Sequence, residues 1–138
     1  MADSLKLAKA ALEARVVAIA SPLPTRWENV VFAPPMDGSA FQHVDIISAP
    51  PDNPTLGDGF YRELGLMQVT LSYPLGNGSG ACYAKAEAIR AWFPRGLTLT
   101  SGGITVHIQR TPAIGPKLPS TDRFVLPVTV RWYADVFA

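Results

Sequence analysis

The spacing of apolar residues predicts two amphipathic helices. The first is expected to begin with Ser4 as its N-cap and to end before Pro22, because the residue before a proline avoids the helical region. The second is expected from about Ser79 to Phe93, where Pro94 stops it. Each helix has one apolar face: Leu5, Ala8, Leu12, Val16 and Ile19 in the first, and Cys82, Ala86, Ile89 and Phe93 in the second.

Other segments alternate between apolar and polar residues, which predicts strands with one buried face. A change of phase near Gly65 predicts a β-bulge or bend in the longest of them. Pro127 lacks a backbone N–H, so the last strand is expected to lie partly at an edge or to be bulged there. The expected strands are residues 29–32, about 41–49 (closed by Pro50 and Pro51), 60–74, 104–109 and 123–137, with a short strand at 97–99 as a further option.

This order, α-β-β-β-α-β-β, predicts a single α+β domain over residues 1–138, with two helices packed on a mainly antiparallel sheet. Two loops, residues 50–59 and 112–122, are dense in proline and other turn formers. Both are longer than the usual connection, so we expect them to be functional or mobile.

Composition points away from several functional classes. Charged residues make up 17% of the chain and hydrophobic residues 48%, which hints that a partner covers part of the surface. The net charge is +1 with no run of Lys or Arg, so the basic stripe of a dedicated nucleic-acid binder is absent. Charges scattered through the first twenty residues exclude a signal peptide or membrane span there. We expect a soluble protein made inside the cell.

The turn "PLGNGSGACYAKAEAIR" resembles a phosphate cradle, because a strand, a glycine-rich turn and a helix follow one another. Gly76, Gly78 and Ala81 nominally fit G-x-G-x-x-G/A. However, no acid follows about 20 residues later to hold a ribose, and the lysine of a P-loop is missing. We therefore favour a plain strand-to-helix turn, with Ser79 as the helix N-cap.

The sequence offers little support for a catalytic site or a metal site. His43 and His107 lie far apart in the sequence on the polar faces of strands, which argues against a metal site. Cys82 falls on an apolar stripe, so a buried side chain is favoured over a nucleophile. Asp52, Asp58 and Glu63 near one loop are too common a pattern to indicate a carboxylate pair. We expect no enzymatic activity, cofactor or metal.

Several segments in a fixed order carry a family resemblance. They are "ALEARVVAIA", "WENVVFAPP", "NPTLGDGFYRELGLMQVTLSYPLGNGSGACYAKAEAIRAWFPRG", "GGITVHIQRTPAIGP" and "VLPVTVRWYADVF". Together they resemble the tail terminator-like proteins of long-tailed bacteriophages and prophages, over about residues 7–137. No single motif is diagnostic; their order and spacing are the specific feature.

The resemblance implies a structural virion protein located at the head-proximal end of the tail and assembled in the host bacterial cytoplasm. Its relatives form a homo-hexameric ring that caps the tail tube, stops tube polymerisation and meets a head-completion, stopper or neck protein. Genome DNA would pass through the channel without sequence-specific contact. A role as another neck, head–tail connector or tail tube protein is the nearest alternative, and a nucleotide- or ligand-binding enzyme using the turn at residues 76–80 is the more distant one.

We predict that the interface residues lie in the two long loops and the glycine turn. Leu56 and Phe60 are apolar residues in a segment otherwise rich in turn formers, which is typical of a contact surface. Lys117 and Arg123 border the second loop and could approach DNA or a partner. The full expected set is Pro50, Pro51, Leu56, Phe60, Tyr61, Gly76, Asn77, Lys117 and Arg123.

Overall fold

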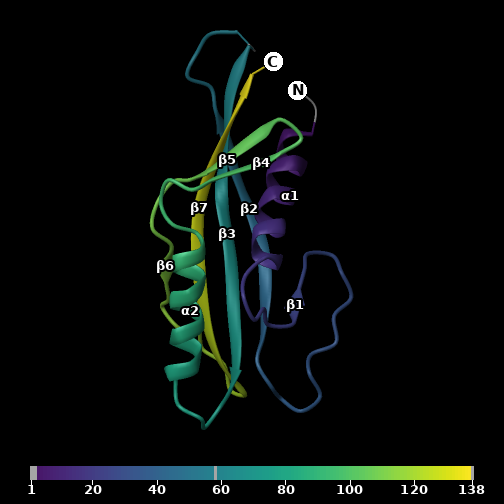
Figure 1. Ribbon diagram of the computed structural model, residues 1–138, viewed down its shortest axis with the longest axis vertical. Helices are drawn as coiled ribbons and strands as arrows, with labels where there is room; N and C mark the ends of the chain where they lie inside the picture. Colours follow the sequence, from purple (N-terminus) through teal and green to yellow (C-terminus); the bar gives the residue numbers. More distant parts are fainter. Residues whose placement is uncertain (1–2, 58, 138) are drawn as a thin grey trace.

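One long antiparallel ladder, formed by β3 (Phe60–Pro74) and β7 (Arg123–Phe137), runs through the molecule (Figure 1). The computed structural model describes residues 3–57 and 59–137. The other elements are α1 (Ser4–Val17), β1 (Thr25–Arg26), β2 (Phe41–Asp52), α2 (Gly80–Trp92), β4 (Thr98–Ser101), β5 (Ile104–Ile108) and β6 (Ala113–Ile114).

The strands form one sheet in the order β1-β2-β3-β7-β5-β4, with β6 paired to β7 beside β5. All pairs are antiparallel except β1 with β2. The expected α+β class with two helices on a mainly antiparallel sheet is therefore confirmed. The optional strand at residues 97–99 is present as β4, which begins one residue and ends two residues later than expected.

Both helices pack on the same side of the sheet, and the core lies between (Figure 1). The sheet curls so that its last strand, β4, also contacts α1. The expected apolar faces are confirmed in β3, α2, β5 and β7, where alternate or helically spaced residues are buried. These include Met67, Val69, Leu71, Cys82, Ala86, Ile89, Ile104, Val106, Ile108, Leu126, Val128, Val130 and Trp132.

The C-terminal ends of the two helices hold each other through Arg15 and Trp92. The Arg15 guanidinium donates two hydrogen bonds to the Trp92 carbonyl oxygen, at 3.0 and 2.9 Å, and lies 3.7 Å from the centre of the indole ring. In return, Trp92 Nε1 donates to the Arg15 carbonyl oxygen at 2.7 Å. Carbonyl groups left unpaired at both helix ends thus gain donors from the other helix.

Three boundaries near the N-terminus differ from expectation. Residues 29–32 form a turn and not a strand, and the short strand of this region is β1, six residues before Val31. Val31 is fully exposed, so the apolar run that suggested a strand has no sheet to join. Asp3 is the N-cap of α1, and Ser4 is its first residue, with its hydroxyl 3.1 Å from that of Tyr61.

The bulge lies in β2 rather than at Gly65. Pairing of β3 with β7 is regular from end to end, whereas the β2–β3 register shifts between Ala49 and Asp52. Pro50 and Pro51 therefore lie inside a bulged β2 instead of closing it, because outer-edge residues need no ladder N–H. The loop expected at residues 50–59 shortens to residues 53–59.

Gly65 serves close packing. It pairs with Ser48 on one side and with Trp132, the largest fully buried side chain, on the other. A Cβ at Gly65 would overlap the Ile47 carbonyl oxygen and lie 3.1 Å from Trp132 Cζ2. Only glycine lets the β2 backbone and the indole ring approach this closely.

The bulge expected as one option at Pro127 is absent, because β7 pairs regularly with β3. On its other side β7 is only partly paired, by β5 at residues 132–134 and by β6 at 128–129, so Pro127 lies where this side has no strand partner. The Pro127 carbonyl oxygen accepts a hydrogen bond from the Gly115 N–H at 2.8 Å. The N and the carbonyl of one strand residue point to the same side. The side of Pro127 that lacks an N–H therefore faces the segment of β6, which was expected to be a loop. The hydrogen bonds between β7 and β3 are not interrupted.

Replacing Gly65 with alanine should destabilise the protein by about 1–3 kcal/mol, the usual cost of overpacking. Chemical denaturation of Gly65→Ala measures this change. Gly80→Ala is the matched control, since a Cβ at Gly80 meets nothing within 4 Å. Equal stability of the two variants would contradict the close-packing role.

Candidate subunit and partner interface

The nine expected interface residues separate into two groups at opposite ends of the β3–β7 ladder. Phe60 pairs with Phe137 at one end, and Pro74 pairs with Arg123 at the other. The ends are roughly 50 Å apart at the usual rise per strand residue. One group is Pro50, Pro51, Leu56, Phe60 and Tyr61, and the other is Gly76, Asn77, Lys117 and Arg123.

The first group surrounds the β2–β3 loop, which projects past the body of the molecule beside the end of β7 (Figure 1). Pro50 and Pro51 are exposed, and Leu56 is 102% exposed, so its side chain is not packed against the described residues. Asp58 lies outside the described residues. One solvated leucine is ordinary at a protein surface, so the role of this tip as an interface stays a prediction.

Phe60 and Tyr61 are anchored within the subunit. The Phe60 ring lies 4.9 Å from that of Phe137 on the face of the sheet away from the helices. Tyr61 lies on the helix side, packs against the core and meets the Ser4 hydroxyl. Their observed contacts hold the base of the loop, whereas Leu56 is free at its tip.

At the opposite end, Gly76, Asn77 and Lys117 are exposed. Gly76 and Gly78 have φ of +86° and +76°, so these two glycines shape the turn from β3 into α2. These residues form an accessible surface at the end of the ladder far from Leu56.

Arg123 is engaged inside the subunit. Its guanidinium donates to the Ser72 hydroxyl at 2.9 Å, the Ser72 carbonyl at 2.9 Å, the Gly38 carbonyl at 2.6 Å and the Ser39 carbonyl at 3.0 Å. It also lies 5.1 Å from the centre of the Phe41 ring. These bonds tie the β1–β2 loop to the sheet and occupy most of the donors that DNA or a partner would use.

The topology around the glycine turn differs from that of a nucleotide site. Such a site needs a parallel βαβ unit. The strand after α2 is β4, which is antiparallel to β3 and separated from it by β7 and β5. Ser79 is at the N-cap position as expected, but its side chain makes no capping hydrogen bond.

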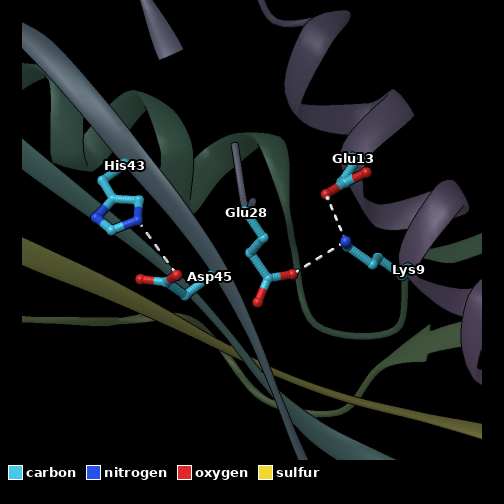
Figure 2. A network of polar contacts seen from close by, with 5 residues as sticks. All are labelled: Lys9, Glu13, Glu28, His43 and Asp45. Atoms are coloured by element: carbon cyan, nitrogen blue, oxygen red, sulfur yellow. Dashed lines mark ion pairs between the residues drawn. The ribbon is translucent and has the colours of Figure 1, made fainter. Parts of the chain in front are cut away.

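Two separate sets of ion pairs lie near β1 (Figure 2). Lys9 Nζ lies 3.2 Å from a Glu28 carboxylate oxygen and 3.7 Å from one of Glu13. The hydrogen bond to Glu28 is the main cause of a raised Lys9 pKa. On β2, His43 Nε2 lies 3.2 Å from Asp45 Oδ1. These exposed pairs tie α1 to the segment after β1 and contribute little to stability.

The described residues also show no site suited to metal or thiol chemistry. The described part of the chain contains no group of three His, Cys, Asp or Glu residues that could hold a metal ion. Cys82 is buried, and burial raises the pKa of its thiol to about 11. His107 stacks on Tyr133 with ring centres 4.9 Å apart. Within residues 3–57 and 59–137, no helix is long and apolar enough to cross a membrane.

Sequence reasoning missed two exposed apolar surfaces. One is the β1–β2 loop, where Val30 is 56% exposed, and Val31 and Met36 fully so. The other is the sheet face away from the helices, which we call the open face, where Ile47, Leu64 and Leu66 lie. The sequence pattern gives both segments another interpretation, because it predicts a strand at residues 29–32 and a β-bulge or bend near Gly65.

Comparisons with known proteins agree with this fold. A family model described as phage tail terminator protein matches residues 8–132. No curated protein matches the chain. One similar solved structure is 27% identical, with a TM-score of 0.75, and the match covers 97% of this chain and 96% of that one. The same architecture therefore extends along the whole of both chains.

Cys82 should be almost inert to alkylation in the folded protein. Its pKa rises from 9.0 to about 11, so at pH 8 its thiolate fraction falls roughly 100-fold, before burial slows access further. Iodoacetamide labelling followed by mass spectrometry measures the rate in native and unfolded protein. An exposed cysteine introduced as Leu75→Cys is the control, and equal labelling of both thiols would contradict the buried assignment.

Proposed function

The chain belongs to the phage tail terminator protein family, and we propose that six copies form a ring capping the head-proximal end of the tail tube. It is a phage tail structural protein. In this proposal the ring stops tube polymerisation and offers its other side to a head-completion, stopper or neck protein. Genome DNA passes through the channel without sequence-specific contact, and the subunit performs no catalysis.

The observation that carries the proposal is the set of apolar side chains left exposed on a well-packed domain. Leu56, Val31 and Met36 are fully solvated, although 22 hydrophobic residues form a complete core. Single exposed apolar residues are ordinary, but apolar loops at separate sites on one small domain are typical of surfaces that other chains cover. A ring on a tube supplies several such chains at once.

The two ends of the ladder support a subunit that terminates a stack. A terminator must bind the tube on one side and refuse a further tube ring on the other. The end with Leu56 is a projecting tip that carries one fully exposed leucine, whereas the end with Gly76 and Asn77 is a glycine-rich turn beside the half-exposed Leu75. We assign the surface around Pro50, Pro51 and Leu56 to contacts with the tube or a neighbouring subunit.

The proposal places the protein in the virion, at the head-proximal end of the tail, after assembly in the host bacterial cytoplasm. Neighbouring copies in a closed ring meet through two different flanks, a heterologous contact that closes by rotation. Lys117 is exposed and available to the channel or to a partner. Because Arg123 bonds within its own subunit, we give it the role of holding the β1–β2 loop in place.

Deleting the gene should yield tails of uncontrolled length that fail to join heads. Loss of the cap leaves tube polymerisation without a stop, whereas loss of a tube protein leaves no tails. Negative-stain electron microscopy of lysates gives the tail length distribution, and a plasmid copy of the gene provides the control. Tails of normal length would contradict the terminator assignment, and an absence of tails would favour the tube alternative.

Replacing Leu56 with aspartate should block tail joining while leaving the fold intact. The side chain is fully exposed among the described residues, so the free energy of unfolding should change by less than about 0.5 kcal/mol, as for other surface sites. Denaturation and counts of infectious particles measure the two effects. Leu75→Asp, half-exposed at the other end of β3, is the comparison, and normal infectivity of Leu56→Asp would remove the tip from the interface.

A further inference from the structure

The open face of the sheet is polar in one half, whereas the other half, which we call the apolar half, carries apolar residues beside the Arg62–Asp135 pair and Arg131. Near β1 it carries His43, Asp45, Gln68 and Thr70, as expected for a solvated sheet face. Toward the β2–β3 loop it carries Ile47, Leu64 and Leu66, followed by the Phe60–Phe137 pair. Ile47 is 47% exposed and Phe137 is 70% exposed, so this half has no cover within the subunit.

The apolar half is concave. A hollow of about 180 Å³ crosses the strands between Ile47, Ala49, Leu64 and Leu66, with Arg131 on its margin. A second hollow of about 200 Å³ adjoins it and is lined by Arg110, Thr111 and Thr129. Arg131 lines both hollows. We call the two together the Arg131 groove. Its size suits an aliphatic side chain with a few polar neighbours.

The groove is positively charged and has no counter-charge of its own. Arg110 and Arg131 make no ion pair with the described residues, and none of the residues lining the groove is acidic. By contrast, Arg62 on the same face forms a two-point ion pair with Asp135, at 2.6 and 3.1 Å. Guanidinium groups without an ion pair favour a partner that brings a carboxylate.

The β2–β3 tip has the complementary properties. Leu56 is a fully exposed aliphatic side chain at its end. The segment of residues 50–63 contains three acids, Asp52, Asp58 and Glu63, and only one base, Arg62. Asp52 is exposed and forms the last pair of the β2–β3 ladder with Arg62, whose guanidinium is bonded to Asp135. The tip therefore offers an apolar knob and a net negative charge.

We propose that the β2–β3 tip of one copy docks in the Arg131 groove of the next copy, with Leu56 in the hollow beside Ile47. This proposal rests on the ring proposed above and names the contact between its neighbours. Only the Ile47 end of the groove lies on the β2–β3 hairpin that carries the tip, and the fully exposed Leu56 is not packed against the described residues of its own chain. The contact is heterologous, so each copy uses both halves of it and the chain of contacts can close into a ring.

Cross-linking between two cysteine variants tests this docking. On a Cys82→Ala background, tails are assembled from an equal mixture of Leu56→Cys and Ile47→Cys copies and treated with a short bismaleimide. Dimers of the chain are expected, with a yield at least ten times that of a Leu75→Cys and Ile47→Cys mixture. A chain carrying both Leu56→Cys and Ile47→Cys should give a ladder of cross-linked species up to the full ring.

Other outcomes separate this inference from the function on which it rests. Chains present at the tail end without Leu56–Ile47 cross-links overturn the docking and leave the terminator role standing. Cross-linking of Val31→Cys to Ile47→Cys in place of Leu56→Cys assigns the groove to the β1–β2 loop and overturns the choice of occupant. Chains absent from tails overturn the proposed function itself.

Exchanging the charges of Arg131 and Asp52 tests the electrostatic part of the proposed contact between tip and groove. Arg131→Glu and Asp52→Arg should each reduce the cross-link yield roughly five-fold, the effect of about one lost surface ion pair. The double variant should recover most of the yield, because the opposite charges again face each other. Asp122→Arg, at the far end of the ladder, is the control for net charge. A double variant as poor as its parents would overturn the pairing of tip and groove.

Discussion

The packing of Trp132 against Gly65 is the contact on which the geometry of this sheet depends. It lies where β2, β3 and β7 run side by side, and the indole is the largest fully buried group in the subunit. With no Cβ at Gly65, the β2 backbone closes over the ring and all three strands continue toward the tip. The projecting β2–β3 hairpin therefore grows from a close-packed base, which gives its exposed end a defined position.

The two helices cover only one face of this sheet, which has consequences for assembly. Both helices pack on the core face, joined at their ends by the reciprocal bonds of Arg15 and Trp92. The open face then has to be either polar or covered by another chain, since apolar surface in water is unfavourable. Half of it is polar, and the half around Ile47 and Leu66 is not. In the proposed ring, a neighbouring copy would cover that half.

The arginines illustrate how tertiary contacts assign roles to identical side chains. Arg15, Arg62 and Arg123 each complete bonds inside the subunit, to a helix end, a neighbouring strand and a loop respectively. Arg110 and Arg131 border hollows on the open face without an acid beside them. Their sequence contexts do not distinguish these groups. The first group maintains the fold, and the second is available to a partner.

The sequence by itself determined the helices, the long strands and their buried faces, because these depend on local periodicity. Its residue patterns also argued against the common catalytic and metal chemistries, and the order of its segments indicated the family. Tertiary structure decided everything that depends on distant pairing. Gly65 appeared to be a bulge until Trp132 was seen beside it, and the side of Pro127 that lacks an N–H was placed only when Gly115, just after β6, was seen to donate to the Pro127 carbonyl. The apolar half of the open face was equally hidden, because its residues come from β2, β3 and β7 and only the sheet brings them together.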